Sequence, residues 1–513
     1  MSDALERWVL TAEAQATLDN DAYAAGVSQD ALMESAGRNA ATWILNHRRP
    51  ARAVVLAGLG GNGGDGLVVA RRLRAAGIAV QTYITALPSK GSATARMAQR
   101  LAASGAAPAP ILESWDELDS ALANADVIVD ALFGSGVTRP LEHDHAKIVD
   151  RINAAHGLTV SLDLPSGLAA DQGTSLGASV CADVTLAMAF LKPAHVLYPA
   201  AARCGQIDVV DVAYPPRLLN AVSPWAHVLE SRGVSARLPD RPPHGHKGTF
   251  GRVLVVAGSI GMTGAAMLCC RGALRAGAGL VYLAIPASLD PILESALPEV
   301  ITLPIADDDG HLRSTDTSTL RDPLRRCDVL AIGPGLTRRP GVLAAVCAII
   351  DAFDGRLVID ADALPALKDA GRALRLAGRS VLTPHPGELA RLVEKPPEAI
   401  ERTRRDAART FADASGCVVA LKGRPTVIAS PGAAVFVNTT GSDALATAGS
   451  GDVLTGLVAG LLAGGASPED AAVAAAYIHG AAADLFVRHR SARSMLASDL
   501  LDLFPRAFRA LES

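Results

Sequence analysis

The chain has 513 residues, of which half are hydrophobic and 4% aromatic, and its formal net charge is −4. At about 100–200 residues per domain, this length predicts two or three domains with cores of small aliphatic side chains. The lack of excess positive charge disfavours a nucleic-acid-binding protein. No stretch reaches the roughly 18 uninterrupted apolar residues of a membrane span, and the acidic N-terminus is unlike a signal peptide. We therefore expect a cytoplasmic protein without membrane contacts.

The cysteines and histidines indicate neither disulfides nor a zinc site. Seven cysteines are scattered, mostly in apolar runs, and none forms a Cys-x-x-Cys pair. We interpret them as reduced core residues. The twelve histidines lack zinc-binding spacing, so no transition-metal site is expected.

Short β-branched runs alternate with stretches of helical period in two long blocks. Continuous apolar runs of this kind are typical of parallel strands buried on both faces, which predicts an α/β fold of layered sheets. The expected strands of the first block are residues 53–57, 79–84, 127–132, 158–162 and 184–190. Those of the second block are residues 253–257, 280–285, 329–332, 357–360, 381–383 and 418–421.

A proline-rich, charged stretch separates the two blocks. Residues 215–243 contain two Pro-Pro pairs and show weak periodicity, so this stretch is the best linker candidate. We place the boundary near residue 222, which gives domains 1–222 and 223–513. Two Ala-rich helices are expected near the C-terminus, at residues 452–464 and 468–487.

The first block opens with a strand that runs into a glycine-rich turn. Gly58, Gly60 and Gly63 satisfy the dinucleotide fingerprint, in which glycines let the backbone approach a pyrophosphate at a helix N-terminus. The acid that would hold the ribose is missing, because Gln81 and Thr82 occupy its place. An ordinary NAD-dependent dehydrogenase is therefore disfavoured. The alternative is a tight turn that serves packing alone.

Two further strand ends in this block carry acids, at Asp130 and Asp163. Each could be a helix N-cap. The carboxyl ends of parallel strands meet at one edge of a sheet, so we expect Asn62, Asp130 and Asp163 to face one crevice.

The sequences GLGGNGGDG, VDALFGSGVTRPL, LDLPSGL and Lys192-Pro193 resemble, in order and spacing, the YjeF N-terminal family of NAD(P)H-hydrate epimerases. The resemblance covers about residues 8–215 and implies a Rossmann-like domain that interconverts R- and S-NAD(P)HX with bound potassium. One departure is Gly61, where the family usually has Asn. Hard cations prefer oxygen ligands, which suits the implied potassium set Asn62, Asp130 and Ser166. The implied substrate contacts are Gly61, Asn62, Gly63, Gly64, Asp65, Gly134, Ser135, Gly136, Val137, Thr138, Arg139, Pro140 and Asp163. Asp163 and Lys192 are the candidates for proton handling at the epimerised carbon.

The second block ends in an anion-binding pattern of its own. The first glycine-rich turn, residues 258–266, lacks the Gly-Lys-Ser/Thr of a P-loop. At Gly449-Ser450-Gly451-Asp452 the backbone N–H groups of a helix start can form an anion hole, and Asp452 can accept a proton from an attacking hydroxyl. This equipment suits phosphoryl transfer. The alternative, an acid that stabilises the helix dipole, would not need Gly-Ser-Gly.

The motifs TPHPGE, KG-x-x-T and GSGD resemble, in this order, the YjeF C-terminal family of ADP- or ATP-dependent NAD(P)H-hydrate dehydratases of ribokinase-like fold. The resemblance covers about residues 236–510. His385 lies between two prolines, which favours a contact role, whereas Lys422 could also snorkel from the end of a buried strand. The implied substrate contacts are Ala266, Gly335, His385 and Asp452, with Asp452 as the base. The implied contacts to the adenine nucleotide are Lys422, Gly423, Arg424, Pro425, Thr426 and Gly451.

The two resemblances together imply a bifunctional repair enzyme. It would epimerise R- and S-NAD(P)HX and dehydrate the S form to NAD(P)H with ADP, giving AMP and phosphate. The implied cofactors are K⁺ in the epimerase site and Mg²⁺ with ADP in the dehydratase site. We also expect a homo-oligomer. The alternative is a ribokinase-like small-molecule kinase fused to a noncatalytic nucleotide-binding scaffold, although loss of Asp130 or Asp163 would have favoured that scaffold and both are present.

Overall fold

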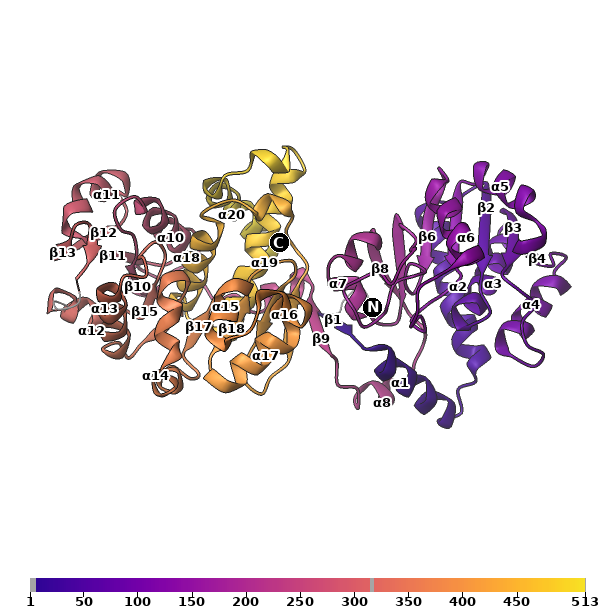
Figure 1. Cartoon of the computed structure of the whole chain (residues 1–513), viewed down its shortest axis with the longest axis horizontal. Helices are drawn as coiled ribbons and strands as arrows, with labels where there is room; N and C mark the ends of the chain where they lie inside the picture. Colours follow the sequence, from indigo (N-terminus) through magenta and orange to yellow (C-terminus); the bar gives the residue numbers. More distant parts are fainter. Residues whose placement is uncertain (1–5, 314–317, 513) are drawn as a thin grey trace. The chain divides into compact units, whose positions relative to one another are not determined.

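The computed structural model describes residues 6–313 and 318–512. It divides into two compact units, unit 1 with Arg7–Ala226 and unit 2 with His227–Ser513. Figure 1 colours them along the sequence from indigo to yellow.

Unit 1 contains a seven-stranded parallel sheet in the order β4-β3-β2-β5-β6-β7-β8. The strands are β2 (Arg52–Ala57), β3 (Ala79–Ile84), β4 (Ala109–Pro110), β5 (Val127–Ala131), β6 (Leu158–Leu162), β7 (Val184–Met188) and β8 (Gln206–Val210). The helices are α1 (Ala12–Ala24), α2 (Gln29–His47), α3 (Gly61–Ala75), α4 (Ala93–Ala103), α5 (Trp115–Ala123), α6 (His143–Ala154), α7 (Pro193–Val196) and α8 (Pro216–Leu219).

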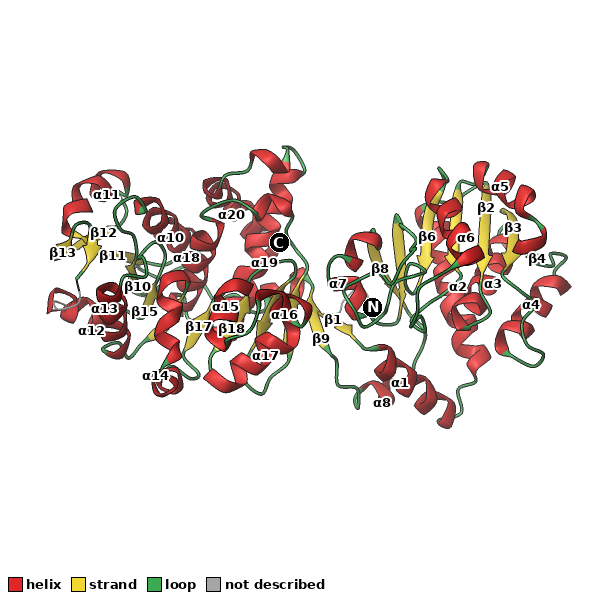
Figure 2. Cartoon of the chain, in the orientation of Figure 1, coloured by secondary structure: helices red, strands yellow, loops and turns green. Residues whose placement is uncertain are grey.

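Helices cover both faces of this sheet (Figure 2). Side chains alternate across a strand, so Val55 packs in a core with α2, α3 and α4, whereas Val54 packs in a second core with α5 and α6. The result is the three-layer α/β arrangement that the sequence predicts.

The sheet of unit 2 has the order β9-β20-β19-β18-β17-β16-β15-β10-β11-β12. A short strand, β1 (Glu6–Val9), precedes α1 in the chain. The strands of unit 2 are β9 (Ala226–Leu229), β10 (Arg252–Val256), β11 (Leu280–Pro286), β12 (Ile301–Ile305), β15 (Val329–Ile332), β16 (Arg356–Ile359), β17 (Ser380–Leu382), β18 (Val418–Leu421), β19 (Thr426–Ala429) and β20 (Val435–Asn438), and a separate hairpin joins β13 (Asp307–Asp308) to β14 (His311–Leu312). Strands β10 to β12 and β15 to β18 pair in parallel, and β19 pairs antiparallel with both neighbours. This sheet confirms the α/β prediction for the second block.

The helices of unit 2 are α9 (Ser231–Ser235), α10 (Thr263–Arg275), α11 (Asp290–Ala296), α12 (Arg321–Arg326), α13 (Pro340–Asp351), α14 (Ala370–Arg375), α15 (Pro386–Val393), α16 (Pro397–Arg402), α17 (Arg404–Ser415), α18 (Ser450–Ala463), α19 (Pro468–Val487) and α20 (Ala497–Glu512). Within the two described ranges, α19 is the one helix long and apolar enough to cross a membrane, but 67% of its most apolar window is buried inside the protein. We therefore assign it to the core of unit 2.

The stretch predicted as a linker is structured. Residues 215–243 contain α8, β9 and α9, and His227 of β9 pairs with Phe436 of β20. Ala226 and Val228 of β9 are buried. Two alternating apolar residues between proline pairs are too few to predict a strand from the sequence. Pro216 is the first residue of α8, a position that a proline tolerates well. A proline-rich stretch can therefore still contain helices and strands.

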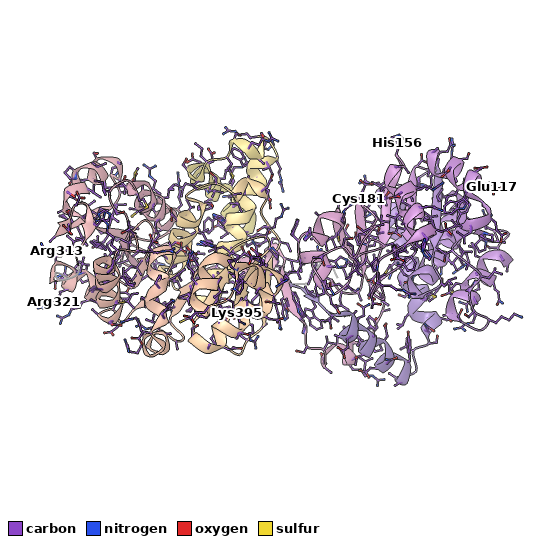
Figure 3. The ribbon with its side chains drawn as sticks, viewed as in Figure 1. Glu117, His156, Cys181, Arg313, Arg321 and Lys395 are labelled. Atoms are coloured by element: carbon purple, nitrogen blue, oxygen red, sulfur yellow. The ribbon has the colours of Figure 1, made fainter. Side chains whose placement is uncertain are left out.

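The prediction that the cysteines fill the core is wrong for Cys181. Its thiol is exposed and lies 3.1 Å from the Arg203 guanidinium (Figure 3). Cys347 is half-buried, and the remaining five cysteines are buried. All seven are free thiols.

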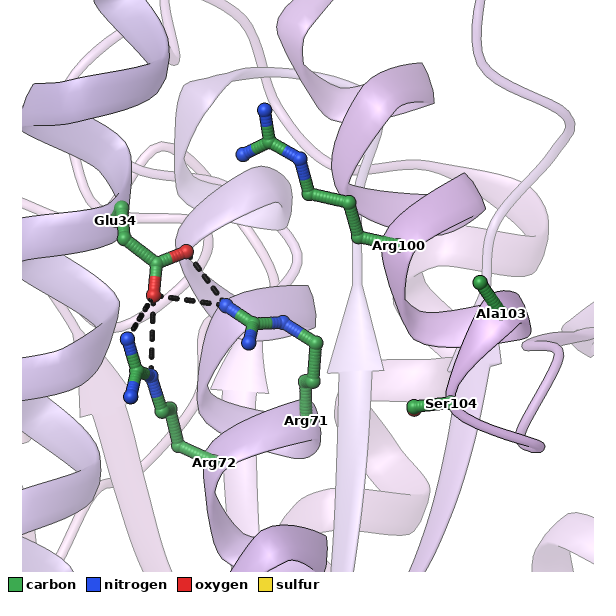
Figure 4. Close-up of a pocket in the computed structure, with 6 residues that line it drawn as sticks. All are labelled: Glu34, Arg71, Arg72, Arg100, Ala103 and Ser104. Carbon is green, nitrogen blue, oxygen red and sulfur yellow. Dashed lines mark hydrogen bonds and ion pairs between the residues drawn. The ribbon is translucent and has the colours of Figure 1, made fainter.

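An ion-pair network joins the helices that carry the glycine-rich turn of unit 1. Glu34 of α2 accepts hydrogen bonds from Arg71, at 2.5 and 2.8 Å, and from Arg72, both on α3 (Figure 4). Asp30 of α2 pairs in the same way with Arg96 and Arg100 of α4. Each carboxylate thus pairs with two guanidiniums, and together the two carboxylates join α2 to α3 and to α4.

Helices α10 and α18 pack closely enough to exclude side chains at their contact. A Cβ added to Gly456 of α18 would lie 2.0 Å from the Cys269 carbonyl oxygen, and one added to Gly272 of α10 would lie 2.7 Å from the Val453 carbonyl oxygen. The small residues in these helices therefore fix the position of α18, whose first turn carries Asp452.

We expect Gly456→Ala to destabilise unit 2 by about 1–3 kcal/mol, because the methyl group forces two packed backbones apart. Gly341→Ala is the matched control, since Gly341 is an exposed residue in the first turn of α13 and an added Cβ would meet nothing within 4 Å. Alanine there should stabilise the helix by about 0.5–1 kcal/mol. Urea unfolding measures both changes, and an unchanged midpoint for Gly456→Ala would contradict the packing argument.

Candidate active sites

The glycine-rich turn of unit 1 joins β2 to α3 and uses its glycines for two purposes. A Cβ on Gly58 would lie 1.8 Å from the Leu132 carbonyl oxygen, and one on Gly63 would lie 1.9 Å from the Gly58 carbonyl oxygen. These two glycines permit the close turn itself. Gly60 and Gly61 would meet nothing within 4 Å, so their backbone is open to a ligand. The packing and the binding interpretations therefore apply to different residues of one motif.

Asp130, at the end of β5, is completely buried and fully hydrogen-bonded. Its carboxylate accepts from the Ser166 hydroxyl at 2.6 Å, the Ser166 amide at 2.9 Å and the Ser161 hydroxyl at 2.8 Å. Burial raises the pKa of this carboxyl, and the serine hydrogen bonds partly oppose the rise. Asp130 thus fixes the loop after β6 that carries Ser166.

The Asn62 side chain is buried, yet neither its oxygen nor its nitrogen has a hydrogen-bond partner. A buried amide without partners costs free energy, which marks a place where a ligand supplies the missing contact. Gly134 lies beside it, because an added Cβ would be 3.3 Å from the Asn62 Cβ and 3.2 Å from an Asp163 oxygen. The structure therefore brings Asn62 and Asp163 together around Gly134, as the strand-end argument predicts for these two, whereas Asp130 is completely buried. Asn62 and Ser166 offer oxygen ligands of the kind that a hard monovalent cation takes.

A buried ion pair occupies the ends of β6 and β7. The Lys192 ammonium is fully buried, pairs with the Asp163 carboxylate and donates to the Phe190 carbonyl at 3.1 Å. Burial raises the pKa of the Asp163 carboxyl, but the ammonium more than offsets this, so the pKa lies below its ordinary value. The pair that the sequence proposed for proton handling is thus preformed and charged.

Both strands of this pair end in strained turns. Asp163 has φ +62°, and Leu164 N–H donates to the Leu162 carbonyl across it at 2.8 Å. Ala189 has φ +61°, with a 2.7 Å bond from Phe190 N–H to the Met188 carbonyl. This i-to-i+2 bond around a residue with positive φ is a γ-turn of the rare, strained form. Strain of this kind clusters at functional sites, and here it turns Asp163 toward the Lys192 ammonium.

His195 clamps the two loops that carry the ion pair. Its Nδ1 accepts from the Lys192 amide at 2.9 Å, which leaves Nε2 to donate to the Asp163 carbonyl at 2.8 Å. Burial, followed by the Lys192 charge, lowers the pKa of His195 to about 4. Sequence reasoning missed this residue, because a single histidine inside a short helix has no distinguishing spacing.

Two more groups near the pair were also missed. Tyr214, after β8, donates its hydroxyl to Asp19 of α1, and burial raises the pKa of Asp19. Burial and then the charges of Asp163 and Asp19 raise the pKa of Asp65 well above its ordinary value. Asp65 is in the predicted set, but Asp19 and Tyr214 come from sequence positions 195 residues apart and share no motif.

The predicted loop after β5 is only partly tied to this cluster. The Ser135 amide donates to Asp163 at 3.2 Å, whereas Gly136, Thr138, Arg139 and Pro140 are exposed. Contacts of residues 136–140 with a substrate therefore stay a prediction.

In unit 2, the glycine-rich turn before α18 forms the expected helix start. Gly449 is the N-cap with φ +90°, a conformation that favours glycine, and α18 begins at Ser450. The first N–H groups of a helix have no intrahelical acceptor, so this turn presents donors to an anion. His479 of α19 contacts this turn, with 2.9 Å between its Nε2 and the Ser450 carbonyl oxygen.

Asp452, in the first turn of α18, lies in a cluster of acids that contains one lysine. Burial, followed by the negative charge of Asp360, raises the pKa of Asp452 to about 6. The Lys422 ammonium lies 2.7 Å from an oxygen of Asp360 and 3.9 Å from Glu388. It also lies 3.4 Å from where a Cβ on Gly451 would be. Lys422 is therefore paired across the site, which excludes the snorkelling alternative.

His385 forms the N-cap of α15. Its Nδ1 accepts from the Gly387 amide at 3.0 Å and the Glu388 amide at 3.3 Å, and Glu388 in return accepts from the His385 amide at 2.7 Å. Burial lowers the pKa of His385. Because Nδ1 accepts from two amides, the ring proton lies on Nε2. Half of its side chain remains exposed. The structure thus places His385 and Glu388 beside Lys422.

Gly335 lies beside the start of α10, the helix that carries Ala266. Gly335 has φ +65°, and its carbonyl accepts from the Ser259 hydroxyl at 2.7 Å. Ala266 is fully buried in the core, 3.0 Å from where a Cβ on Gly258 would be, so its side chain contacts protein. Substrate contact at Ala266 stays a prediction.

The loop from Lys422 to Thr426 is held from beneath by Arg404, which the sequence did not single out. Its guanidinium donates to the carbonyls of Lys422 at 2.8 Å and Pro425 at 3.0 Å. The Arg424–Pro425 peptide bond is cis. Arg404 is 5% exposed, so this cation acts as a structural support under the proposed nucleotide loop.

Two family models match the chain. One, described as YjeF-related protein N-terminus, matches residues 29–194, and the other, described as NAD(P)H-hydrate dehydratase, matches residues 253–506. The bifunctional NAD(P)H-hydrate repair enzyme Nnr of Moorella thermoacetica is 40% identical over 94% of this chain and 92% of its own length. The chain belongs to the bifunctional NAD(P)H-hydrate repair enzyme family.

Other relatives agree with this family assignment. The protein of the same name from Thermofilum pendens is 35% identical over 95% of this chain and 93% of its own length. Among solved structures, the ADP/ATP-dependent NAD(P)H-hydrate dehydratase from Bacillus subtilis, co-crystallized with ATP/Mg²⁺, is 34% identical, with a TM-score of 0.47. The match covers 55% of this chain and 97% of that chain.

We expect His195 to make the stability of unit 1 depend on pH. Its pKa is lowered from 6.5 to about 4 in the folded protein, so the unfolded chain binds more protons between these values. Above pH 6.5 the neutral His195 costs no stability. As the pH falls toward 4, the free energy of unfolding of unit 1 should decrease by up to about 3 kcal/mol. His195→Gln, whose amide can accept and donate in the same directions, should flatten this dependence. Urea unfolding of the full chain, read by hydrogen exchange in β6 and β7, tests it, and equal slopes for both proteins would contradict it.

Proposed function

We propose that this chain repairs hydrated nicotinamide cofactors at two sites: unit 1 epimerises R- and S-NAD(P)HX, and unit 2 dehydrates the S form with ADP. The observation that carries the proposal is the cluster at the start of α18. It combines helix N–H donors, the Lys422 ammonium and an Asp452 carboxyl whose pKa is raised to about 6. These are the groups that phosphoryl transfer to a hydroxyl requires.

In the dehydratase reaction Asp452 is the base. It takes the proton of the C6 hydroxyl while that oxygen forms a bond to the terminal phosphorus of ADP, and the bond from this phosphorus to the AMP oxygen breaks. The helix donors and Lys422 stabilise the charge on the transferred group. Phosphate then leaves C6 with the bonding electron pair, and loss of a ring proton restores the double bond of NAD(P)H. Phosphate leaves far more readily than hydroxide, so phosphorylation by ADP lowers the barrier to elimination.

Substrate and nucleotide contacts are assigned to two sets of residues around Asp452. Ala266, Gly335 and His385 are proposed to contact the hydrate, and half of the His385 side chain is exposed, with its Nε2 3.3 Å from a Glu388 oxygen. The loop from Lys422 to Thr426, together with Gly451, is proposed to contact ADP. Mg²⁺ bound with ADP would neutralise phosphate charge.

In the epimerase reaction Asp163 and Lys192 handle the proton at C6. Their ion pair is buried and charged, so one member can accept a proton and the other can donate one. Residues of the loops 61–65 and 134–140 are proposed to hold the substrate. Potassium would supply a fixed positive charge that orients substrate oxygens, with Asn62, Asp130 and Ser166 as its ligands. The unpartnered Asn62 amide supports this assignment.

We also propose a cytoplasmic homo-oligomer with small-molecule ligands and no nucleic-acid or membrane partner. The net charge of −4 and the free thiols support this environment.

A mixture of R- and S-NADHX supplied with ADP and Mg²⁺ tests both activities through the absorbance of the returning NADH. We expect full recovery with the wild-type chain, with kcat/KM falling below about pH 6 as Asp452 is protonated. Asp452→Asn should lower dehydration by at least about a hundredfold and spare epimerisation. Normal dehydration by this variant would overturn the assignment of the base. Recovery of the S fraction alone would exclude the epimerase.

Potassium dependence tests the first site separately. Asn62→Ala should raise the K⁺ concentration needed for half-maximal epimerisation by about tenfold or more, because it removes a ligand oxygen that makes no bond within the protein. Exposed Asn220→Ala is the matched control and should change nothing. The measurement is a KCl titration at constant ionic strength with choline chloride. Identical K⁺ curves for Asn62→Ala and the wild type would contradict the ligand set.

A further inference from the structure

Asp360 is a buried carboxylate near the start of α18 with both oxygens bound to other side chains. It directly follows β16 and is 1% exposed. One of its oxygens lies 2.7 Å from the Lys422 ammonium, and the other accepts the Thr455 hydroxyl at 2.7 Å. Thr455 is on α18, one turn after Gly451, and its hydroxyl also lies 3.2 Å from the Gly451 carbonyl oxygen. One buried carboxylate therefore joins β16, the end of β18 and the first turns of α18.

We propose that Asp360 is the positioning residue of the dehydratase site: it holds the Lys422 ammonium against the first turn of α18, where the phosphates of the nucleotide bind. The inference rests on the proposed function, since it presupposes that this turn binds ADP. Both oxygens of Asp360 are bound to protein groups, so we assign it a positioning role and no contact with substrate or nucleotide.

The geometry explains why a lysine needs such an anchor. Its side chain is long and rotatable, and an ammonium is a compact charge without a fixed hydrogen-bond fork. Lys422 has a second acid nearby in Glu388, but that distance is 3.9 Å against 2.7 Å for Asp360. Glu388 is also engaged in the cap of α15. Without Asp360 the ammonium would be drawn toward α15 and away from Gly451.

The same carboxylate acts on the base. Four charged groups act on Asp452: Asp360 and Asp362 after β16, Lys422 after β18, and Glu388 on α15. The thiol of Cys269 on α10 also interacts with Asp452. Apart from burial, Asp360 is the largest influence that raises the pKa of Asp452, larger than the opposing effect of Lys422. Removing the Asp360 charge should therefore lower the pKa of Asp452 even if Lys422 moves away.

The test uses Asp360→Asn in the full chain, with Asp351→Asn as a matched control. Asp351 is a partly exposed carboxylate of α13 that pairs with Arg372 and Arg375 and takes no part in the site. For Asp360→Asn we expect the Kd of Mg·ADP, from titration calorimetry, to rise about tenfold or more, and the acid limb of kcat/KM to move to lower pH. A merely structural role would lower the amount of active enzyme and leave that limb at about pH 6. The control should match the wild type in both measurements.

Two further variants separate position from charge. Asp360→Glu keeps the charge but moves the carboxylate, so ADP binding should weaken while the acid limb stays in place. This variant carries the test should Asp360→Asn fail to fold. In the Lys422→Met background, Asp360→Asn should weaken ADP binding no further, because the two residues act as one unit.

Additive effects in that double variant, or an unchanged Kd for both Asp360 variants, would overturn the proposal. A wild-type chain that does not bind ADP would overturn the proposed function and this inference with it. A wild type that binds ADP and dehydrates, beside an Asp360→Asn variant that matches it, would overturn the inference alone.

Discussion

A lysine paired with an aspartate at the end of a buried parallel strand is the interaction around which each unit arranges its polar groups. Lys192 pairs with Asp163 in unit 1, and Lys422 pairs with Asp360 in unit 2. Taking two charges out of water is costly, and such a pair is tolerated only when further hydrogen bonds satisfy it. The Met188 carbonyl at the end of β7 and the Thr455 hydroxyl on α18 supply these bonds. Both pairs thus require that several loops meet at one point. A parallel sheet brings them together, because the carboxyl ends of its strands lie at one edge.

The small side chains of the cores serve the same end. With 4% aromatic residues and 47 glycines, the helices can lie close to the sheets and to one another. Gly272 and Gly456 let α10 and α18 touch backbone to backbone, and Gly58 and Gly63 let α3 begin directly at the end of β2. Close packing leaves little freedom for the first turns of α3 and α18, so the N–H groups there are held in fixed directions.

The sequence predicted the parallel strands well, because a continuous apolar run bounded by turns is a local pattern. The expected ranges 79–84, 158–162, 329–332 and 418–421 coincide with strands of the structure. The missed strands β9, β19 and β20 are no shorter than β15 and β18. Strands β18, β19 and β20 pair antiparallel through short loops, so the alternation with helical stretches that marked the other strands is absent there. Site residues inside motifs could be proposed from spacing. His195, Tyr214 and Arg404 could not, since their partners are remote in sequence or are backbone carbonyls.

The γ-turn at Asp163 sets two demands on one residue. The backbone there, with φ +62°, favours glycine, whereas the buried Lys192 ammonium needs a carboxylate. No standard side chain meets both demands. Glycine at position 163 would relieve the backbone strain but would leave the buried Lys192 ammonium without a counter-charge, which costs more than the strain itself. Thermostabilised versions of this protein have to be sought elsewhere in the fold, at positions such as the exposed ends of its helices.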